Sequence, residues 1–254
     1  MSDRQRQLHY LNAMGIPVWE RRPLWRDTGD GHAQIAPDPV PETDHVPADV
    51  RPATPEPAAV VEPEPRDHWL RLRETVSVCT RCALSQGRTQ TVFGVGSEHA
   101  RLMIVGEAPG AEEDRRGEPF VGRAGKLLDR MLDAIALDRE QVFIANILKC
   151  RPSRNRDPQA AEVEACMPYL WEQMHLLRPR VILCVGKVAA NNLLQLDRPL
   201  RDLRASEHSL RVDEDSVPVI VSYHPAYLLR NPADKGKAWH DLKRVRALLR
   251  EMAA

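Results

Sequence analysis

The sequence predicts an α/β fold, a three-layer α/β/α sandwich around a central four-stranded parallel sheet. Two patterns predict it. Four short apolar runs follow residue 66, and each is typical of a strand that is buried on both faces. Segments with apolar residues at helical spacing separate these runs, and such alternation favours parallel strands joined by helices. The four runs are residues 101–106, 142–147, 180–186 and 217–223.

Predicted helical segments lie between these strands and after the last one. Segment 122–137 (GRAGKLLDRMLDAIAL) has Leu127, Leu128, Met131, Leu132 and Ile135 along one stripe. Segment 157–177 opens with Asp-Pro and has acids in its first turns, which are signals of a helix start. Segments 187–196 and 237–252 complete the set. Ligands of such folds bind beyond the carboxyl ends of the strands. The motifs GEAPG, NILKCRP and YHPAYLLR fall at those ends.

The sequence divides into three parts: residues 1–26, 27–65 and 66–254. Segment 27–65 is predicted to be a disordered linker, because it is rich in proline and acidic residues. Segment 1–26 has apolar residues at helical spacing, and we expect either a partner-docking peptide or a segment that packs on its own domain. It resembles the N-terminal peptide of the psi subunit of the bacterial clamp loader, which implies a partner in the replication machinery.

The net charge of zero hides an asymmetry. Residues 1–65 contain six arginines and eleven acidic residues, whereas the rest contains 30 basic and 25 acidic residues. A mildly basic domain suits a nucleic-acid partner, and it suits an ordinary solvated surface equally well. The apolar runs are too short to span a bilayer and no leader peptide opens the chain. We therefore expect a cytoplasmic monomer without membrane contact, in which cysteines are reduced or metal-bound.

Four of the five cysteines have the spacing of a metal site. Cys79 and Cys82 form a C-x2-C pair, and Cys150 and Cys166 follow after a long gap with fifteen residues between them. Cys184 lies inside an apolar strand and fits a small core residue. Four thiolates from two regions can surround zinc or hold an iron–sulfur cluster. The spacing does not choose between these metals, and four unrelated free cysteines are the third interpretation.

Three side chains near the strand ends are candidates for ligand binding. GEAPG lacks the glycine pattern of a dinucleotide fingerprint and the lysine of a P-loop, which disfavours a nucleotide cofactor. Asn146 has a carboxamide that suits the edge of a pyrimidine, or it caps a turn. Phe120 either stacks on a ring or covers the core. His224, followed by a proline, either donates a hydrogen bond to developing negative charge or is structural.

Together these residues resemble the family-four uracil-DNA glycosylases of the wider uracil-DNA glycosylase superfamily. The resemblance covers roughly residues 70–250 and rests on the cysteine set and on GEAPGAEED, PFVGRAG, NILKCRP and HPAYLLR in the same order. It implies a DNA-repair enzyme that flips uracil out of DNA and hydrolyses its N-glycosidic bond, leaving an abasic site. It also implies a [4Fe-4S] cluster held by Cys79, Cys82, Cys150 and Cys166.

The resemblance further implies roles in the pocket. Glu107 and the amide of Ala108 would form the first wall, and Glu107 is the candidate for activating water. Phe120 would stack on the flipped uracil, and Asn146 would read its O4 and N3 edge. His224 would stabilise the uracil anion at O2 as the glycosidic bond breaks.

Around the pocket, the resemblance implies five supporting positions. Glu113 would support its loop through Asn155. Leu228 would wedge into the base stack, and Lys187 and Arg230 would lie near phosphates.

Some features depart from the pattern of relatives. Ala108 stands where the best-known branch has an aspartate that activates water, and Ala226 stands where many relatives have serine. The chain lacks the KRRIH insertion of a branch that forms a covalent adduct, so turnover is expected. The alternatives are a non-catalytic uracil- or DNA-binding adaptor tethered to the replication machinery, and a zinc-stabilised hydrolase. The hydrolase is disfavoured because no Ser-His-Asp set or His-rich metal site is evident.

Overall fold

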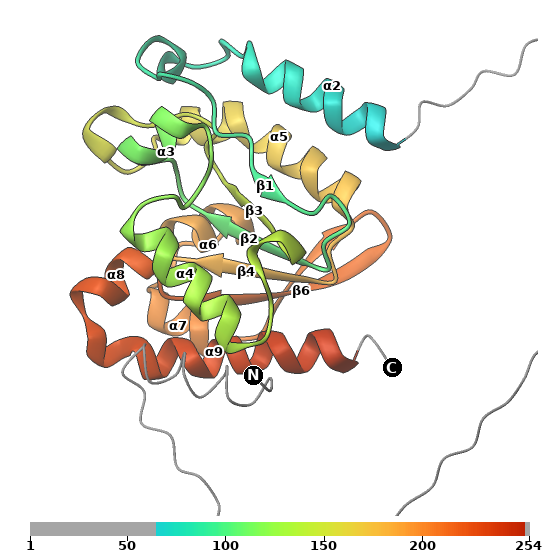
Figure 1. Cartoon of the computed structure of the whole chain (residues 1–254), viewed down its shortest axis with the longest axis vertical. Helices are drawn as coiled ribbons and strands as arrows, with labels where there is room; N and C mark the ends of the chain where they lie inside the picture. Colours follow the sequence, from blue (N-terminus) through green and yellow to red (C-terminus); the bar gives the residue numbers. More distant parts are fainter. Residues whose placement is uncertain (1–64, 252–254) are drawn as a thin grey trace, which may run out of the picture. The chain divides into compact units, whose positions relative to one another are not determined.

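The computed structural model describes residues 65–251, and it has the three layers that the sequence predicts (Figure 1). Its sheet has six strands in the order β1-β3-β2-β4-β6-β5. The four predicted strands lie together and are parallel. They are β2 (Leu102–Gly106), β3 (Phe143–Asn146), β4 (Val181–Val185) and β6 (Asp215–Ser222).

The predicted number of strands was wrong. An antiparallel strand extends each edge of the parallel set: β1 (Val95–Gly96) pairs with β3, and β5 (His208–Val212) pairs with β6. β1 has only two residues, and residues of β5 alternate between partly buried and exposed. Neither therefore has the continuous apolar run that marks a buried strand.

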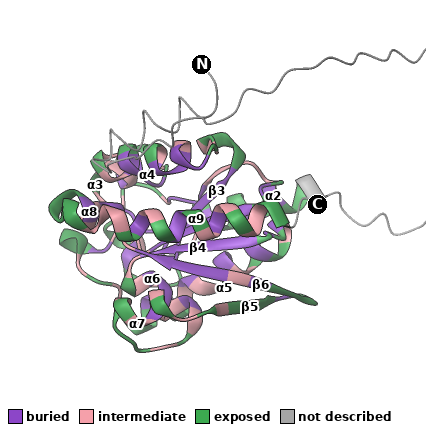
Figure 2. Ribbon diagram, turned by 90° about the horizontal axis from the view of Figure 1, so that it is seen from below, coloured by how far each residue is buried: buried purple, intermediate pink, exposed green. Residues whose placement is uncertain are grey.

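Helices cover both faces of the sheet, and the central strand β4 is buried whereas the edge strand β5 is partly exposed (Figure 2). In β2, Met103 and Val105 pack toward one set of helices, while Leu102 and Ile104 pack toward the other, as the two-residue period of a strand requires. The first set is α2 (Pro65–Ser77), α5 (Ala160–Leu177), α6 (Lys187–Leu194) and α7 (Leu200–Ala205). The second set is α4 (Arg123–Ala134), α8 (Pro225–Arg230) and α9 (Lys235–Glu251).

Short elements lie in the connections. They are α3 (Ala111–Arg116) and the 3-10 turns η1 (Ala83–Gln86), η2 (Arg139–Gln141), η3 (Ser153–Asn155) and η4 (Pro232–Asp234). The loop before α5 is tied to that helix. The Glu162 carboxylate accepts a hydrogen bond from the Gln159 amide at 2.9 Å, so the helix begins at Ala160 and not at the predicted Asp157. The same carboxylate accepts two hydrogen bonds from Arg156.

Two predictions fall outside the part of the chain that the structure describes. They are the docking peptide, residues 1–26, and the linker, residues 27–65, of which only Pro65 is described. Among residues 65–251, no helix is long and apolar enough to cross a bilayer.

Candidate active site and cysteine cavity

A pocket of about 550 Å³ opens at the carboxyl ends of the parallel strands. The segments after β2, β3, β4 and β6 form its walls, as expected for this class of fold. The pocket brings together nine residues predicted from the sequence. They are Glu107, Ala108, Glu113, Phe120, Asn146, Asn155, Lys187, His224 and Arg230.

His224 enters this pocket with a defined tautomer. It follows β6 and caps the N-terminus of α8, where its Nδ1 accepts a hydrogen bond from the Ala226 amide at 3.1 Å. An amide can only donate, so Nδ1 carries no proton and the neutral ring carries its proton on Nε2. Burial lowers the pKa of His224 to about 4; Arg230 acts in the same direction and Glu113 opposes it. At neutral pH, His224 is therefore an uncharged donor through Nε2.

The ring of Phe120 lies against the ring of His224. Their centroids are 5.5 Å apart and the rings are inclined by 28°. Phe120 has a φ of +53°, a left-handed conformation that is unfavourable for an aromatic residue and frequent where a site constrains the backbone. Helix α4 lies very close to this turn. A Cβ added to Gly125 would lie only 1.7 Å from the Phe120 carbonyl oxygen. The turn therefore needs glycine at position 125.

Asn146 ends β3 and its side chain lines the pocket, while the residue as a whole is only 2% exposed. The adjacent strand β2 ends at Gly106, which faces Asn146 in the sheet. A Cβ at Gly106 would lie 2.3 Å from Asn146 Oδ1 and 2.8 Å from Phe120 Cζ. The absence of a side chain at Gly106 thus allows the carboxamide and the aromatic ring to share this corner of the pocket.

Glu107 follows Gly106 at the mouth of β2. Burial raises the pKa of its carboxyl group to about 7, and the charge of Asp157 adds to this effect. A carboxyl group with such a pKa can accept or release a proton near neutral pH. Glu107 can therefore take part in proton transfer within the pocket.

Glu113 supports the pocket through backbone amides. Its carboxylate accepts hydrogen bonds from the amides of Gly110 at 3.1 Å, Val121 at 3.1 Å and Gly122 at 3.3 Å. It therefore joins the loop after β2 to the turn that carries Phe120. The predicted route through Asn155 is replaced by these direct bonds, since the Asn155 side chain accepts a hydrogen bond from Arg151 at 2.7 Å.

The predicted wedge residue needs a correction. Leu228 is 1% exposed and packs in the core between α8, α4 and α9, so it cannot enter a DNA base stack in this conformation. Its neighbour Leu229 is 36% exposed, because successive residues of a helix point about 100° apart. Lys187 at the start of α6 and Arg230 at the end of α8 are exposed residues that line the pocket, as positions near phosphates would require.

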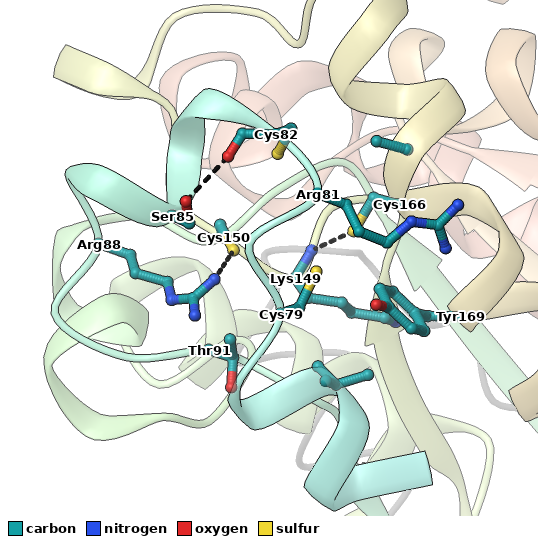
Figure 3. A pocket seen from close by; sticks show the side chains of 12 residues that line it. Cys79, Arg81, Cys82, Ser85, Arg88, Thr91, Lys149, Cys150, Cys166 and Tyr169 are labelled. Atoms are coloured by element: carbon teal, nitrogen blue, oxygen red, sulfur yellow. Dashed lines mark hydrogen bonds between the residues drawn. The ribbon is translucent and has the colours of Figure 1, made fainter.

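Cys79, Cys82, Cys150 and Cys166 line one cavity on the α2 and α5 side of the sheet (Figure 3). Cys79 and Cys82 lie between α2 and η1, Cys150 follows β3, and Cys166 lies within α5. Cys184 is buried in β4, outside this cavity, and its prediction as a core residue is confirmed. Sequence segments that are far apart therefore contribute cysteines to the same cavity.

The four cysteines of this cavity are suited to bind a positively charged metal group as thiolates. Burial raises the pKa of Cys150 and that of Cys166, the latter to about 11, and neighbouring cysteines add to both effects. Four thiolates would therefore repel one another without a cationic centre. Two N–H donors already point at the sulfurs: Arg88 donates to Cys150 Sγ at 3.1 Å, and the Lys149 amide donates to Cys166 Sγ at 3.2 Å. Across residues 65–251, no three His, Cys, Asp or Glu side chains form a site for a single metal ion.

Some residues around the site were not predicted from the sequence. Gly106 was considered only as a nucleotide-loop glycine, and Gly125 only as part of PFVGRAG and of the predicted helix 122–137, not as a close neighbour of Phe120. Arg88, Lys149 and Gln173 were not singled out. A lysine inside the apolar run NILKC is the one available signal, because a buried lysine needs partners.

Known proteins resemble this chain in the same region. The family described as "Uracil DNA glycosylase superfamily" matches residues 93–243. A type-4 uracil-DNA glycosylase of Archaeoglobus fulgidus is 44% identical over 178 residues, which are 68% of this chain and 89% of that protein. Type-4 uracil-DNA glycosylases of Pyrobaculum aerophilum and Thermotoga maritima are 42% and 38% identical, covering 68% and 64% of this chain and 90% and 83% of those proteins. The chain belongs to the uracil DNA glycosylase superfamily, in its type-4 branch.

Proposed function

We propose that the protein removes uracil from DNA by hydrolysing the bond between the base and deoxyribose, leaving an abasic site. The observation that carries the proposal is the neutral His224, which offers an Nε2 proton within the pocket that Asn146 and Phe120 also line. The names and coverage of the type-4 relatives support the same activity.

Recognition begins with a uracil that has left the DNA stack, at a cost of a few kcal/mol. The Asn146 carboxamide donates to uracil O4 and accepts from N3–H, and Phe120 stacks on the ring. Cytosine presents a donor at position 4 and an acceptor at N3, so the same amide orientation rejects it. The buried position of Asn146 at the end of β3 supports this role, because a fixed amide discriminates better than a mobile one.

Bond cleavage places negative charge on the base. As C1′–N1 breaks, the bonding electron pair moves onto uracil N1 and O2, and the sugar gains oxocarbenium character. The Nε2–H of His224 donates a hydrogen bond to O2 and stabilises this charge. A donor of this kind is worth about 3–4 kcal/mol in comparable anion sites.

Water completes the reaction. Its oxygen adds to C1′, and the carboxylate of Glu107 accepts the proton that it loses. The pKa of about 7 supports this role, because a substantial fraction of Glu107 is then ionised at neutral pH while the group is still a useful base. The uracil anion is protonated after release.

The four cavity cysteines hold a [4Fe-4S] cluster in this proposal. When bound, the cluster would supply iron–thiolate bonds to the segment between α2 and η1, to the segment after β3 and to α5, and would thereby cross-link them. Pro152, Asn155 and Arg156 line the pocket from the segment between Cys150 and Cys166. The cysteines would therefore order this wall of the pocket and carry no step of the reaction.

DNA binding around the pocket is assigned to exposed groups. Lys187 and Arg230 are placed at phosphates, and the exposed Leu229 replaces the buried Leu228 as the candidate that fills the space left by the flipped base.

The function is tested with oligonucleotides that contain one uracil, in single- and double-stranded form, followed by alkali to cut abasic sites. Strand cleavage that requires both uracil and alkali supports a glycosylase without lyase activity. Matched oligonucleotides with thymine or cytosine at the same position measure base discrimination. An iron-loaded protein that leaves every uracil in place would exclude the proposal.

A further inference from the structure

Lys149 is a buried cation between the cysteine cavity and the candidate active site. It is 1% exposed, and its Nζ donates to the backbone oxygen of Asn146 at 2.9 Å and to Gln173 Oε1 at 2.6 Å. Gln173 in turn donates through Nε2 to the Phe93 carbonyl oxygen at 2.9 Å. The roles proposed above for the pocket do not use this lysine.

The Asn146 carbonyl lies where the sheet offers it no partner. The Ile147 amide bonds to Gly106 of β2 at 2.9 Å, so Asn146, one residue earlier, directs its carbonyl toward the opposite edge of β3. The strand on that edge, β1, pairs only with Phe143 and Ile144. The lysine Nζ supplies the donor that a longer β1 would have supplied, and a buried carbonyl without a donor is costly.

The same residue contacts the cysteine cavity through its backbone. The Lys149 amide donates to Cys166 Sγ at 3.2 Å, and Lys149 lines the cavity beside Cys150 (Figure 3). Lys149 therefore bonds with its backbone to a cavity cysteine and with its side chain to the residue that lines the pocket. On the other side, Gln173 of α5 accepts a hydrogen bond from the ammonium, and the Phe93 carbonyl oxygen holds the Gln173 side chain in place.

We propose that Lys149 is a positioning residue for Asn146. Its ammonium fixes the backbone at the end of β3, and this sets the position of the Asn146 carboxamide relative to the base. This inference rests on the proposed function. A backbone shift of about 1 Å at a substrate-positioning residue can cost about a hundredfold in rate. The effect of Lys149 must then pass through the Asn146 side chain.

A double-mutant cycle tests this dependence. Single-turnover rates of uracil release, measured with excess enzyme, are compared for the wild type, Lys149→Met, Asn146→Ala and the double variant. We expect Lys149→Met to lose at least about tenfold and to cost little more once Asn146 is alanine, because both changes remove the same interaction. Equal losses in both backgrounds would overturn the inference.

Arg88→Met is the matched control. It also replaces a cation by methionine beside a cavity cysteine, but Arg88 bonds to Cys150 Sγ and the Ser77 carbonyl oxygen and not to Asn146. The fold-loss in rate caused by Arg88→Met should multiply with the fold-loss caused by Asn146→Ala, as expected for independent effects. Iron content and melting temperature are recorded for every variant, so that loss of the cluster is separated from loss of position. Non-additivity of the same size for Arg88→Met would also contradict the inference.

Gln173→Met serves if Lys149→Met does not fold. It keeps Lys149 but removes the bond that holds its ammonium to α5, so a smaller loss of rate that again disappears with Asn146→Ala is expected.

Equilibrium binding to oligonucleotides with 2′-fluorodeoxyuridine, which resists cleavage, gives a second readout: the preference over the thymidine control should fall in Lys149→Met. An unchanged preference would contradict the inference. A wild type without uracil release would instead refute the proposed function and this inference with it, whereas an active wild type with an additive cycle would refute the inference alone.

Discussion

The backbone amide of Ala226 donates to Nδ1 of His224 at 3.1 Å, and this bond determines what the histidine can do. With Nδ1 engaged as an acceptor, the neutral ring donates only through Nε2. Burial lowers the pKa to about 4, so the ring does not acquire a proton from solvent near neutral pH. Alanine at position 226 provides the amide as well as serine would, and the departure from relatives at this position leaves the histidine's tautomer unaffected.

The pH dependence of uracil release separates His224 from Glu107. In the proposed mechanism Glu107 acts as a base, so protonation below its pKa of about 7 removes activity, and the rate should rise with pH from 5 and bend toward a plateau around pH 7 to 8. His224, neutral above about pH 4, adds no decline on the alkaline side. The rate is measured from pH 5 to 7.5 for the wild type and for Glu107→Gln, which should be slow and nearly independent of pH. The control Glu112→Gln, at an exposed carboxylate paired with Arg115, should keep the wild-type profile, and a rate that does not fall below pH 7 would contradict the assignment.

Gly106→Ala should damage the pocket. A Cβ would lie 2.3 Å from Asn146 Oδ1 and 2.8 Å from Phe120 Cζ, so both side chains must move. We expect a stability loss of about 1–3 kcal/mol from overpacking, and a rate loss of about a hundredfold from displacement of Asn146. Urea unfolding and single-turnover rates measure the two effects.

Gly236→Ala is the control for this substitution. Nothing lies within 4 Å of a Cβ at Gly236, which is in the first turn of α9. Alanine there should leave the rate unchanged and stabilise the fold by up to about 1 kcal/mol. A fully active Gly106→Ala variant would show that the close approach of Asn146 and Phe120 is not needed.

Cys166→Ala and Cys184→Ala distinguish a cluster ligand from a core thiol. Cys166 lines the cavity with three other cysteines, whereas Cys184 is fully buried in β4 away from it. Cys166→Ala should lose iron, visible absorbance and uracil release together. Cys184→Ala should keep its iron and lose about 0.5–3 kcal/mol of stability from core packing. Full iron content in Cys166→Ala, measured by metal analysis, would exclude it as a ligand.

Leu228→Ala and Leu229→Ala should affect different properties of the protein. Leu228 is buried between helices, and its truncation should cost about 2–5 kcal/mol of stability. Leu229→Ala should change stability by less than about 0.5 kcal/mol but slow excision from double-stranded DNA, where a base must leave the stack. Excision from single strands should be less affected. A normal duplex rate for Leu229→Ala would remove this residue from the DNA interface.

The sequence was sufficient for the central sheet and for most of the pocket. The apolar runs that become β2, β3, β4 and β6 are continuous because both faces of each strand are covered, which is the pattern a sequence displays most clearly. Asn146 and His224 were predictable for the same reason, since Asn146 ends β3 and His224 lies two residues after β6.

Other features depend on tertiary packing. The buried face of α8 is set by its contact with α4, so the sequence LLR did not reveal that Leu228 points inward and Leu229 outward. β1 is defined by two residues that pair with β3, and the Lys149 ammonium bonds to the Asn146 carbonyl beyond the end of that pairing. Such consequences follow from the three-dimensional arrangement and not from local periodicity.

The most direct measurement compares uracil release by the wild type and His224→Ala on one single-stranded, single-uracil oligonucleotide, with iron content matched. The proposed mechanism predicts alkali-dependent cleavage by the wild type and a loss of about 10²–10³-fold in His224→Ala, at a similar dissociation constant for the cleavage-resistant 2′-fluorodeoxyuridine oligonucleotide. Equal rates for the two proteins would show that the Nε2 proton of His224 does not stabilise the departing uracil.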